Sequence, residues 1–115
     1  MQKGKVYEEK AAQFLQLKGY KILCRNWRSR YGEIDIIARE GAYIVFLEVK
    51  ARASNYQVSG LEALDAAKRA RIIKTALFYT ADKPDGLYRF DVLEIIQGND
   101  WVQYNHIKDA FRMNE

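Results

Sequence analysis

The chain has 115 residues, 49% of them hydrophobic and 30% charged, which fits one domain with a single core and excludes a disordered tail. Its lone cysteine, Cys24, excludes an internal disulfide and a thiolate metal cage, and no apolar run approaches the roughly 18 residues of a membrane span. The net charge of +4 favours polyanionic partners, because neutralising phosphates releases condensed counterions.

The first predicted element is a helix over residues 4–18, which Gly19 is placed to end. One face of this helix carries the apolar side chains of Ala11, Ala12 and Leu15. Glu8 lies on the same face, where a carboxylate needs a partner because this face should meet the sheet. Glu8 is therefore a candidate site residue, whereas Glu9 falls on the polar side and is the weaker candidate.

Strands are predicted next, over residues 21–27, 33–39 and 43–51. Glu40 and Gly41 form a short turn between the last two strands, which should pair as an antiparallel hairpin. A second helix follows over residues 60–79, and two further strands over residues 88–97 and 101–107. The order α-β-β-β-α-β-β indicates an α/β fold with helices packed on a mixed sheet, built as one cytoplasmic domain over residues 1–115.

The second predicted helix has an apolar and a polar side. The apolar stripe is predicted at Ala63, Ala66, Ala70, Ile73 and Leu77, with Ile72 and Ala76 at its edge. The opposite face carries Lys68, Arg71 and Thr75. We therefore expect the first set to pack on the sheet.

Two carboxylates interrupt otherwise apolar strands, in which such residues are depleted. Asp35 stands in the run Ile34-Asp35-Ile36-Ile37, and Glu48 follows thirteen residues later in an even more apolar run. Because side chains alternate along a strand, Glu48 and Lys50 share one face and Val49 points to the other. If the two strands form a hairpin, Asp35 lies beside Glu48 at its open end.

These residues suit a metal-dependent phosphodiesterase. Two close carboxylates repel each other, so at least one keeps its proton unless a cation is present. Mg²⁺ or Mn²⁺ bound by Asp35, Glu48 and the backbone carbonyl of Val49 would remove that conflict. Lys50 can orient or deprotonate a water for in-line attack on phosphorus, or stabilise charge on the phosphate. The alternative is a set of ordinary ion pairs on a half-exposed sheet, with Asp35 paired to a neighbouring arginine and Glu48 to Lys50 or Lys21.

Several motifs in the same order resemble the YraN family of small bacterial proteins over residues 4–111. They are Glu8 with Ala11-Ala12 and Phe14-Leu15, Gly19-Tyr20, Asn26-Trp27-Arg28, Gly32-Glu33-Ile34-Asp35, Phe46-Leu47-Glu48-Val49-Lys50 and Arg89-Phe90-Asp91-Val92. The family is similar in fold to archaeal Holliday junction resolvases, and Asp35 with Glu48-Val49-Lys50 looks like the PD-(D/E)XK nuclease signature. Ile34 stands where the motif name has proline.

The resemblance implies a restriction-endonuclease-like core, a mixed sheet flanked by helices. It maps the nuclease's metal ligands onto Asp35 and Glu48, its lysine onto Lys50 and its helix carboxylate onto Glu8. A resolvase-like activity would be an analogy of fold and site.

Nucleic-acid contacts are expected from cationic and aromatic residues near this site. The candidate phosphate contacts are Arg25, Arg28, Arg30, Arg52, Lys68 and Arg71. The candidates for stacking on unpaired bases are Trp27, Tyr31 and Tyr56.

The leading hypothesis is a Mg²⁺- or Mn²⁺-dependent DNA endonuclease, with branched DNA as one substrate class and a homodimer where a junction needs two cuts. The alternative is a nucleic-acid-binding module in DNA repair or recombination that keeps the fold and cuts nothing. A structural adaptor that meets protein partners through exposed aromatics is the third hypothesis. It leaves the buried carboxylates unexplained.

Overall fold

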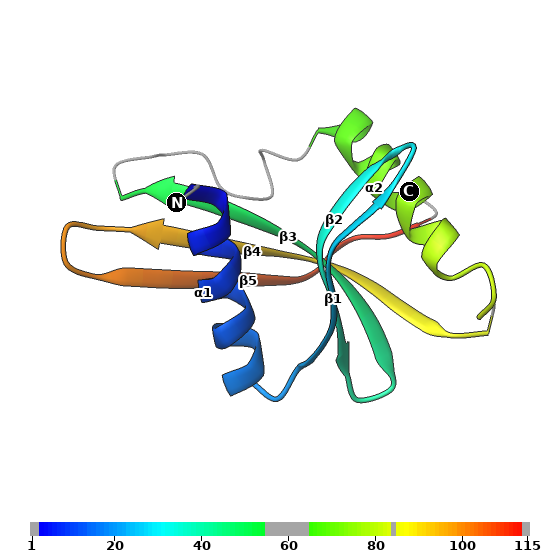
Figure 1. Ribbon diagram of the computed structural model, residues 1–115, viewed down its shortest axis with the longest axis horizontal. Helices are drawn as coiled ribbons and strands as arrows, with labels where there is room; N and C mark the ends of the chain where they lie inside the picture. Colours follow the sequence, from blue (N-terminus) through cyan, green and yellow to red (C-terminus); the bar gives the residue numbers. More distant parts are fainter. Residues whose placement is uncertain (1–2, 55–64, 84, 114–115) are drawn as a thin grey trace.

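The computed structural model describes residues 3–54, 65–83 and 85–113. Its elements are α1 (Lys3–Leu17), β1 (Lys21–Ser29), β2 (Gly32–Glu40), β3 (Tyr43–Ala53), α2 (Ala66–Tyr79), β4 (Leu87–Gln97) and β5 (Val102–Phe111) (Figure 1). This order confirms the predicted α/β fold. Neither helix has the length and apolar character needed to cross a membrane, in the part of the chain that the structure describes.

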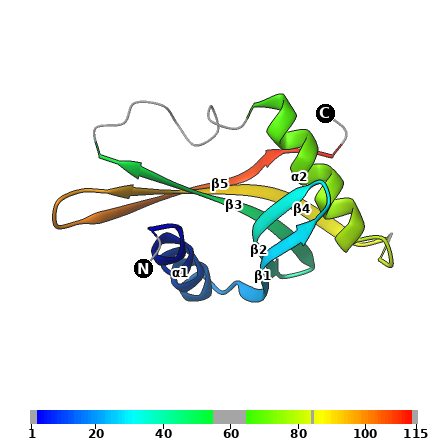
Figure 2. The same ribbon diagram turned by 45° about the horizontal axis from the view of Figure 1, so that its top comes forward.

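One mixed sheet carries all five strands in the order β1-β2-β3-β4-β5. β1, β2 and β3 pair antiparallel in turn, and so do β4 and β5, whereas β3 and β4 are parallel. A parallel pair needs a crossover, and α2 lies within the connection from β3 to β4. The two helices lie on opposite faces of the sheet (Figure 2).

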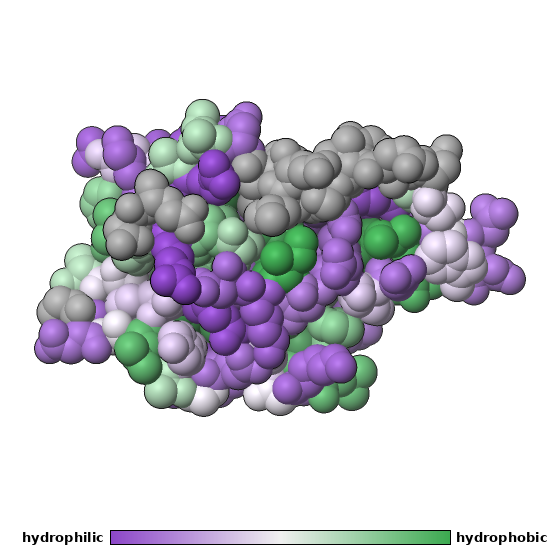
Figure 3. Space-filling model, turned by 180° about the vertical axis from the view of Figure 1, so that it is seen from behind, coloured by the Kyte–Doolittle hydropathy of each residue, from purple (hydrophilic) through white to green (hydrophobic). Residues whose placement is uncertain are grey.

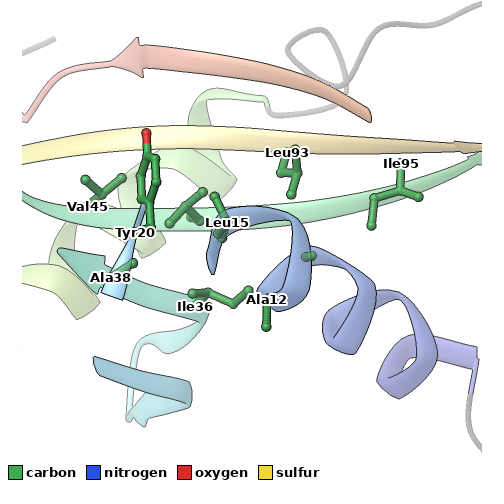
Figure 4. Packing of buried hydrophobic residues seen from close by; sticks show 10 residues of the cluster. Ala12, Leu15, Tyr20, Ile36, Ala38, Val45, Leu93 and Ile95 are labelled. Atoms are coloured by element: carbon green, nitrogen blue, oxygen red, sulfur yellow. The ribbon is translucent and has the colours of Figure 1, made fainter. Parts of the chain in front are cut away.

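The face covered by α1 matches the sequence prediction. The fully buried side chains of this helix are Ala11, Ala12 and Leu15, which pack on strand residues that include Ile36, Leu47 and Leu93 (Figure 4). The helix ends at Leu17, and the chain turns away at Gly19, whose φ of +91° is a left-handed conformation that glycine adopts readily. Tyr20 then donates its N–H to the carbonyl of Leu15 at 2.9 Å.

The buried face predicted for α2 is wrong. Its buried residues are Ile72, Thr75 and Ala76, while Leu77 is half exposed and Ala66 and Ala70 face solvent. Alanines at helical spacing bury little area, so they do not determine the face, and the larger Ile72 packs on the sheet instead. Burial of Thr75 is tolerated because its hydroxyl donates to the carbonyl of Arg71 at 2.8 Å.

The start of α2 differs from the prediction as well. Asp65 is the N-cap, and its carboxylate accepts the N–H of Lys68 at 2.8 Å, so the helix begins at Ala66. Residues 60–64, where the sequence predicts the start of this helix, lie outside the described residues.

The hairpin of β2 and β3 opens before the end of β2. The two strands pair from Glu40 and Tyr43 at the turn to Ile36 and Leu47, and no further. β2 nevertheless continues to Gly32 and stays paired with β1 over this stretch. The strands therefore fork at Asp35, which is where the predicted site begins.

Candidate functional site

Asp35 occupies the fork between β2 and β3. Its carboxylate Oδ2 accepts the backbone N–H of Val49 at 2.8 Å. Because β2 has left β3 at this point, the Val49 amide has lost its strand partner, and the Asp35 side chain takes that place. The predicted neighbourhood of Asp35 and the Glu48–Val49 segment is confirmed, and the half-buried carboxylate has a defined orientation.

Glu48 is a buried carboxylate, 6% exposed, on β3. Its Oε1 atom is buried without a hydrogen-bond partner among the described residues. Burial first, and then the negative charge of Asp35, raise the pKa of Glu48 to about 8, although the nearby Lys68 and Lys50 charges act in the opposite direction. A divalent cation between Asp35 and Glu48 would offset both causes, so these residues fit a metal ion.

Lys50 follows Glu48 by two positions on β3 and is half buried. Burial and the adjacent Lys68 ammonium group, which reaches over from α2, lower the pKa of Lys50. A lysine whose pKa is lowered can release its proton nearer neutral pH and then accept a proton from a bound water.

Two cavities meet at Asp35. The larger is about 570 Å³, and its lining includes Glu8, Asn26, Arg28, Glu33, Asp35 and Val49. The smaller is about 250 Å³ and is lined by Gly32, Glu33, Asp35, Glu48, Lys68, Arg71 and Ile72. Asp35 therefore has Glu8 on one side, from α1, and Glu48 with the α2 cations on the other.

Glu8 reaches the larger cavity from α1, on the face predicted for it. Its Oε1 atom accepts a hydrogen bond from the Asn26 side chain at 2.8 Å. Asn26 lies on β1 with a φ of +53°, a conformation that asparagine tolerates better than most residues. Asn26 lines the larger cavity, and the strand pattern did not single it out. A polar residue inside a strand was the available signal.

Only two neighbouring carboxylates, those of Asp35 and Glu48, are candidates to hold a metal ion in the described parts of the chain. Within residues 3–54, 65–83 and 85–113, no three His, Cys, Asp or Glu side chains are grouped closely enough to hold a metal ion. Mg²⁺ usually needs only one or two carboxylates together with water and substrate phosphate. The ligand set that fits is therefore Asp35, Glu48 and the carbonyl of Val49, with Glu8 beside it.

The predicted phosphate contacts fall into two groups. Arg28, Lys68 and Arg71 line the cavities around Asp35. The other three are Arg25, which lies 2.7 Å from Glu9, Arg52, which is 15% exposed and 3.7 Å from Glu94, and Arg30, which is exposed at the tip of the β1–β2 hairpin. The first group is placed to meet a phosphate that approaches Asp35.

The predicted stacking residues differ in whether their rings lie in the core or near the surface. Trp27 packs edge-on against Tyr79 at a centroid distance of 5.4 Å, in the core beneath α2. Tyr31 stacks on Phe78 of α2 near the surface. Tyr56 lies outside the described residues. Of the two described candidates, only Tyr31 stacks on a ring that is half exposed, that of Phe78.

A buried polar network on β4 went unrecognised in the sequence. Arg89 pairs with Asp91 through Nε at 2.9 Å and with Glu40 through Nη1 at 2.8 Å, and His106 lies 2.8 Å from Asp91. Burial raises the pKa of Asp91, but the hydrogen bonds from His106 and Arg89 outweigh it and leave this pKa below its usual value. Each of these side chains lies against a partner in the network, which joins β4 to β5 and to the β2–β3 turn. The alternation of Arg89 and Asp91 was the signal.

Known proteins are similar to this chain over almost its whole length. A profile of the uncharacterised protein family UPF0102 matches residues 7–95. A UPF0102 protein from Sulfurihydrogenibium sp. (strain YO3AOP1) is 45% identical over 114 residues, which span 97% of this chain and 96% of that protein. UPF0102 proteins from Persephonella marina and Clostridium tetani are 43% and 44% identical, spanning 97% and 96% of this chain and 95% and 93% of those proteins.

Proposed function

The chain belongs to the uncharacterised protein family UPF0102, and on the geometry of its site we propose that it is a nucleic-acid-binding protein and a Mg²⁺- or Mn²⁺-dependent DNA endonuclease. The proposal rests above all on Glu48, a buried carboxylate beside Asp35 with no hydrogen-bond partner for Oε1 among the described residues. Such an arrangement is unfavourable by itself and becomes favourable around a cation.

Ordinary ion pairing does not account for this pair of carboxylates. Of the residues that the structure describes, neither Asp35 nor Glu48 forms a salt bridge, whereas the buried Asp91 and Glu94 each lie against an arginine. The sheet therefore pairs its other buried carboxylates and leaves these two together. That contrast favours a site that takes its cation from solution.

The chain's own residues have separate tasks in phosphodiester hydrolysis. Asp35 is held in place by the Val49 N–H, so its carboxylate is oriented before substrate arrives. Lys50, with its lowered pKa, accepts a proton from the attacking water or, when charged, neutralises the phosphate. Lys68 and Arg71 approach from α2 and attract the substrate's phosphates.

The metal would be held by Asp35, Glu48 and the Val49 carbonyl, and when bound it supplies Lewis-acid charge and a more acidic water. These three oxygen donors would satisfy part of the coordination that a divalent ion such as Mg²⁺ prefers. Because one small domain offers little surface for reading a base sequence, we propose recognition of DNA shape, including branched DNA. Cutting both strands of a four-way junction would then require a homodimer.

A non-catalytic nucleic-acid-binding module is the second candidate. It is favoured by one observation, the lack of a third acidic, histidine or cysteine side chain grouped with Asp35 and Glu48 in the described parts of the chain. Such a protein would bind DNA through the same cations and would hold metal weakly. Calorimetric titration with Mn²⁺ distinguishes the two, because the catalytic site should bind the ion and lose it in Asp35→Asn.

Nuclease assays on labelled four-way, flap, single-stranded and linear duplex DNA test the proposal. Each substrate is incubated with Mg²⁺, Mn²⁺ or EDTA and with wild-type, Glu48→Ala or Lys50→Ala protein. Asp82→Asn is the matched control, because Asp82 is an exposed carboxylate in the turn after α2. Metal-dependent cutting that only the Glu48 and Lys50 variants lose supports the endonuclease. Binding without cutting, unchanged in all variants, supports the non-catalytic module.

A further inference from the structure

The tip of the β1–β2 hairpin is fixed against helix α2, as both ribbon views show (Figures 1 and 2). The Ser29 hydroxyl donates to the Thr75 hydroxyl at 3.2 Å. At Gly32 an added Cβ would lie 3.4 Å from the Thr75 hydroxyl and 3.8 Å from Cβ of Arg71, so the hairpin approaches the helix closely. The tip and α2 therefore present one continuous surface.

One stripe of α2 runs from the smaller cavity to this tip. Lys68, Arg71, Thr75 and Phe78 are spaced by three, four and three positions, which places them on one side of the helix. Lys68 and Arg71 line the cavity that holds Asp35 and Glu48, and Thr75 meets the hairpin. From Lys68 to Phe78 the helix rises about 15 Å, so this stripe is long enough to follow a short stretch of a nucleic-acid strand.

An aromatic pair lies at the far end of the stripe. The rings of Tyr31 and Phe78 stack with centroids 5.4 Å apart and planes 25° from parallel. Lys74 and Arg30 lie over the Tyr31 ring, at 5.1 and 5.8 Å from its centroid. Phe78 remains 51% exposed, although it is a large apolar residue, and cations surround the pair.

We name this surface the α2 track, composed of Arg30, Tyr31, Lys68, Arg71, Lys74 and Phe78. It combines four cations with an exposed aromatic face. Glu33, which lines the same cavity as Lys68 and Arg71, is paired with Arg28 at 3.3 Å. On the face opposite α1, the residues coloured in Figure 3 are hydrophilic side chains with separate hydrophobic residues among them.

We propose that the α2 track binds an unpaired stretch of nucleic-acid strand that continues from the Asp35–Glu48 site. The preferred substrate then has a single-stranded segment next to the bond that is cut. An aromatic face stacks on any base, but only an unpaired strand presents its base faces, because those of a duplex are stacked on one another. The cations suit the phosphates of that strand. This inference rests on the proposed function and narrows its substrate class.

Fluorescence anisotropy in EDTA tests the track without requiring cleavage. The probes are a blunt duplex, the same duplex with a single-stranded tail, and a single-stranded oligonucleotide. Wild-type protein should bind the tailed duplex more tightly than the blunt one. Phe78→Leu and Tyr31→Leu should each weaken binding of the tailed probe by about 5- to 150-fold and leave the blunt duplex unchanged. Lys74→Ala should lower the slope of log affinity against log salt by about 0.7 on single strands.

Two matched controls separate the track from general effects. Trp101→Leu removes another half-exposed aromatic, in the turn between β4 and β5. Lys18→Ala removes a lysine that lies over Phe14 at 5.6 Å, near the end of α1. Both should leave tailed-duplex binding unchanged. Leucine keeps an apolar contact at positions 31 and 78, and thermal unfolding verifies that each variant folds. If a leucine variant does not fold, the salt slope of Lys74→Ala decides whether the α2 track binds the single-stranded tail.

The outcomes separate this inference from the proposed function. Two results would overturn the track, whether or not the protein cuts DNA. One is equal affinity of the wild-type protein for blunt and tailed duplex, and the other is unchanged binding of the tailed duplex by Phe78→Leu and Tyr31→Leu. Either result leaves the surface to a protein partner. Loss of tail preference in these variants supports the track even where wild-type protein cuts nothing. Wild-type protein that binds none of the probes overturns both proposals.

Discussion

Replacing Glu48 with glutamine should stabilise the protein in the absence of metal. Burial and the neighbouring Asp35 raise the pKa of Glu48 from 4.5 to about 8. The folded state therefore keeps a proton that the unfolded chain has lost, so the free energy of unfolding falls as the pH rises from about 4.5 to 8. One pKa unit corresponds to about 1.36 kcal/mol, so at pH 7 the penalty is on the order of 3 kcal/mol.

Thermal unfolding in EDTA between pH 5 and 9 measures this effect. The Tm of the wild-type protein should fall as the pH rises, whereas the Tm of Glu48→Gln should fall less and be higher by about 10 °C at pH 7. Glu48→Met serves as a second variant, because it has no polar atoms and so avoids burying an amide without partners. Mn²⁺ at about 100 times its dissociation constant should raise the stability of the wild type by about 2.7 kcal/mol and leave both variants unchanged.

Glu94→Gln is the control for a buried carboxylate that has partners. Glu94 is 5% exposed, accepts a hydrogen bond from Asn105 at 3.2 Å and lies 3.7 Å from Arg52. Its neutralisation should lower the stability by about 1–3 kcal/mol, the opposite direction to Glu48. If neither Glu48 variant is more stable than the wild type at pH 8 in EDTA, the carboxylate is satisfied within the fold and the argument for a cation there is refuted.

Three further predictions concern the rest of the molecule. Asp91→Asn should lower stability by about 3 kcal/mol in urea unfolding at pH 7, because Arg89 loses its buried partner. Because the pKa of Asp91 is lowered, its contribution to the free energy of unfolding is present above the usual carboxyl pKa of 3.8 and is lost as the pH falls below it. Asp91→Asn should therefore lose less stability in acid than the wild type does. Asp65→Ala should cost about 1 kcal/mol through loss of the α2 cap, measured as a lower Tm with reduced helical circular dichroism. Lys68→Glu with Arg71→Glu should reduce the salt slope of duplex DNA binding by about 0.9 for each phosphate that the protein no longer neutralises, and an unchanged slope would exclude these residues from the interface.

Local patterns were sufficient for the strands, the first helix and the composition of the site. Alternation along β3 places Glu48 and Lys50 together because side-chain direction in a strand depends only on the local backbone. Likewise, the face of α1 that carries Ala11, Ala12 and Leu15 follows from helical spacing within one element. The hairpin turn then brought Asp35 to the level of Glu48, since β2 and β3 pair directly through it.

The buried face of α2 could not be predicted from helical spacing in the same way. Its alanines offered several stripes of similar hydrophobicity, and the choice of Ile72, Thr75 and Ala76 depends on the sheet and hairpin beneath them. Thr75 looks like a surface residue in the sequence. It is buried because Ser29, forty-six positions earlier, supplies a hydrogen-bond partner.

The sequence alone therefore determined the family, the order of the elements, and the presence of Asp35, Glu48 and Lys50 on two adjacent strands. Only the tertiary structure decided how these groups are used: the fork that sets Asp35 against the Val49 amide, the lack of a hydrogen-bond partner for Glu48 Oε1 among the described residues, and the pairing of Tyr31 with Phe78. The physical reason is that hydrophobic period and turn chemistry act between near neighbours in the chain. Burial, desolvation and contacts between a hairpin tip and a distant helix depend instead on how whole elements pack.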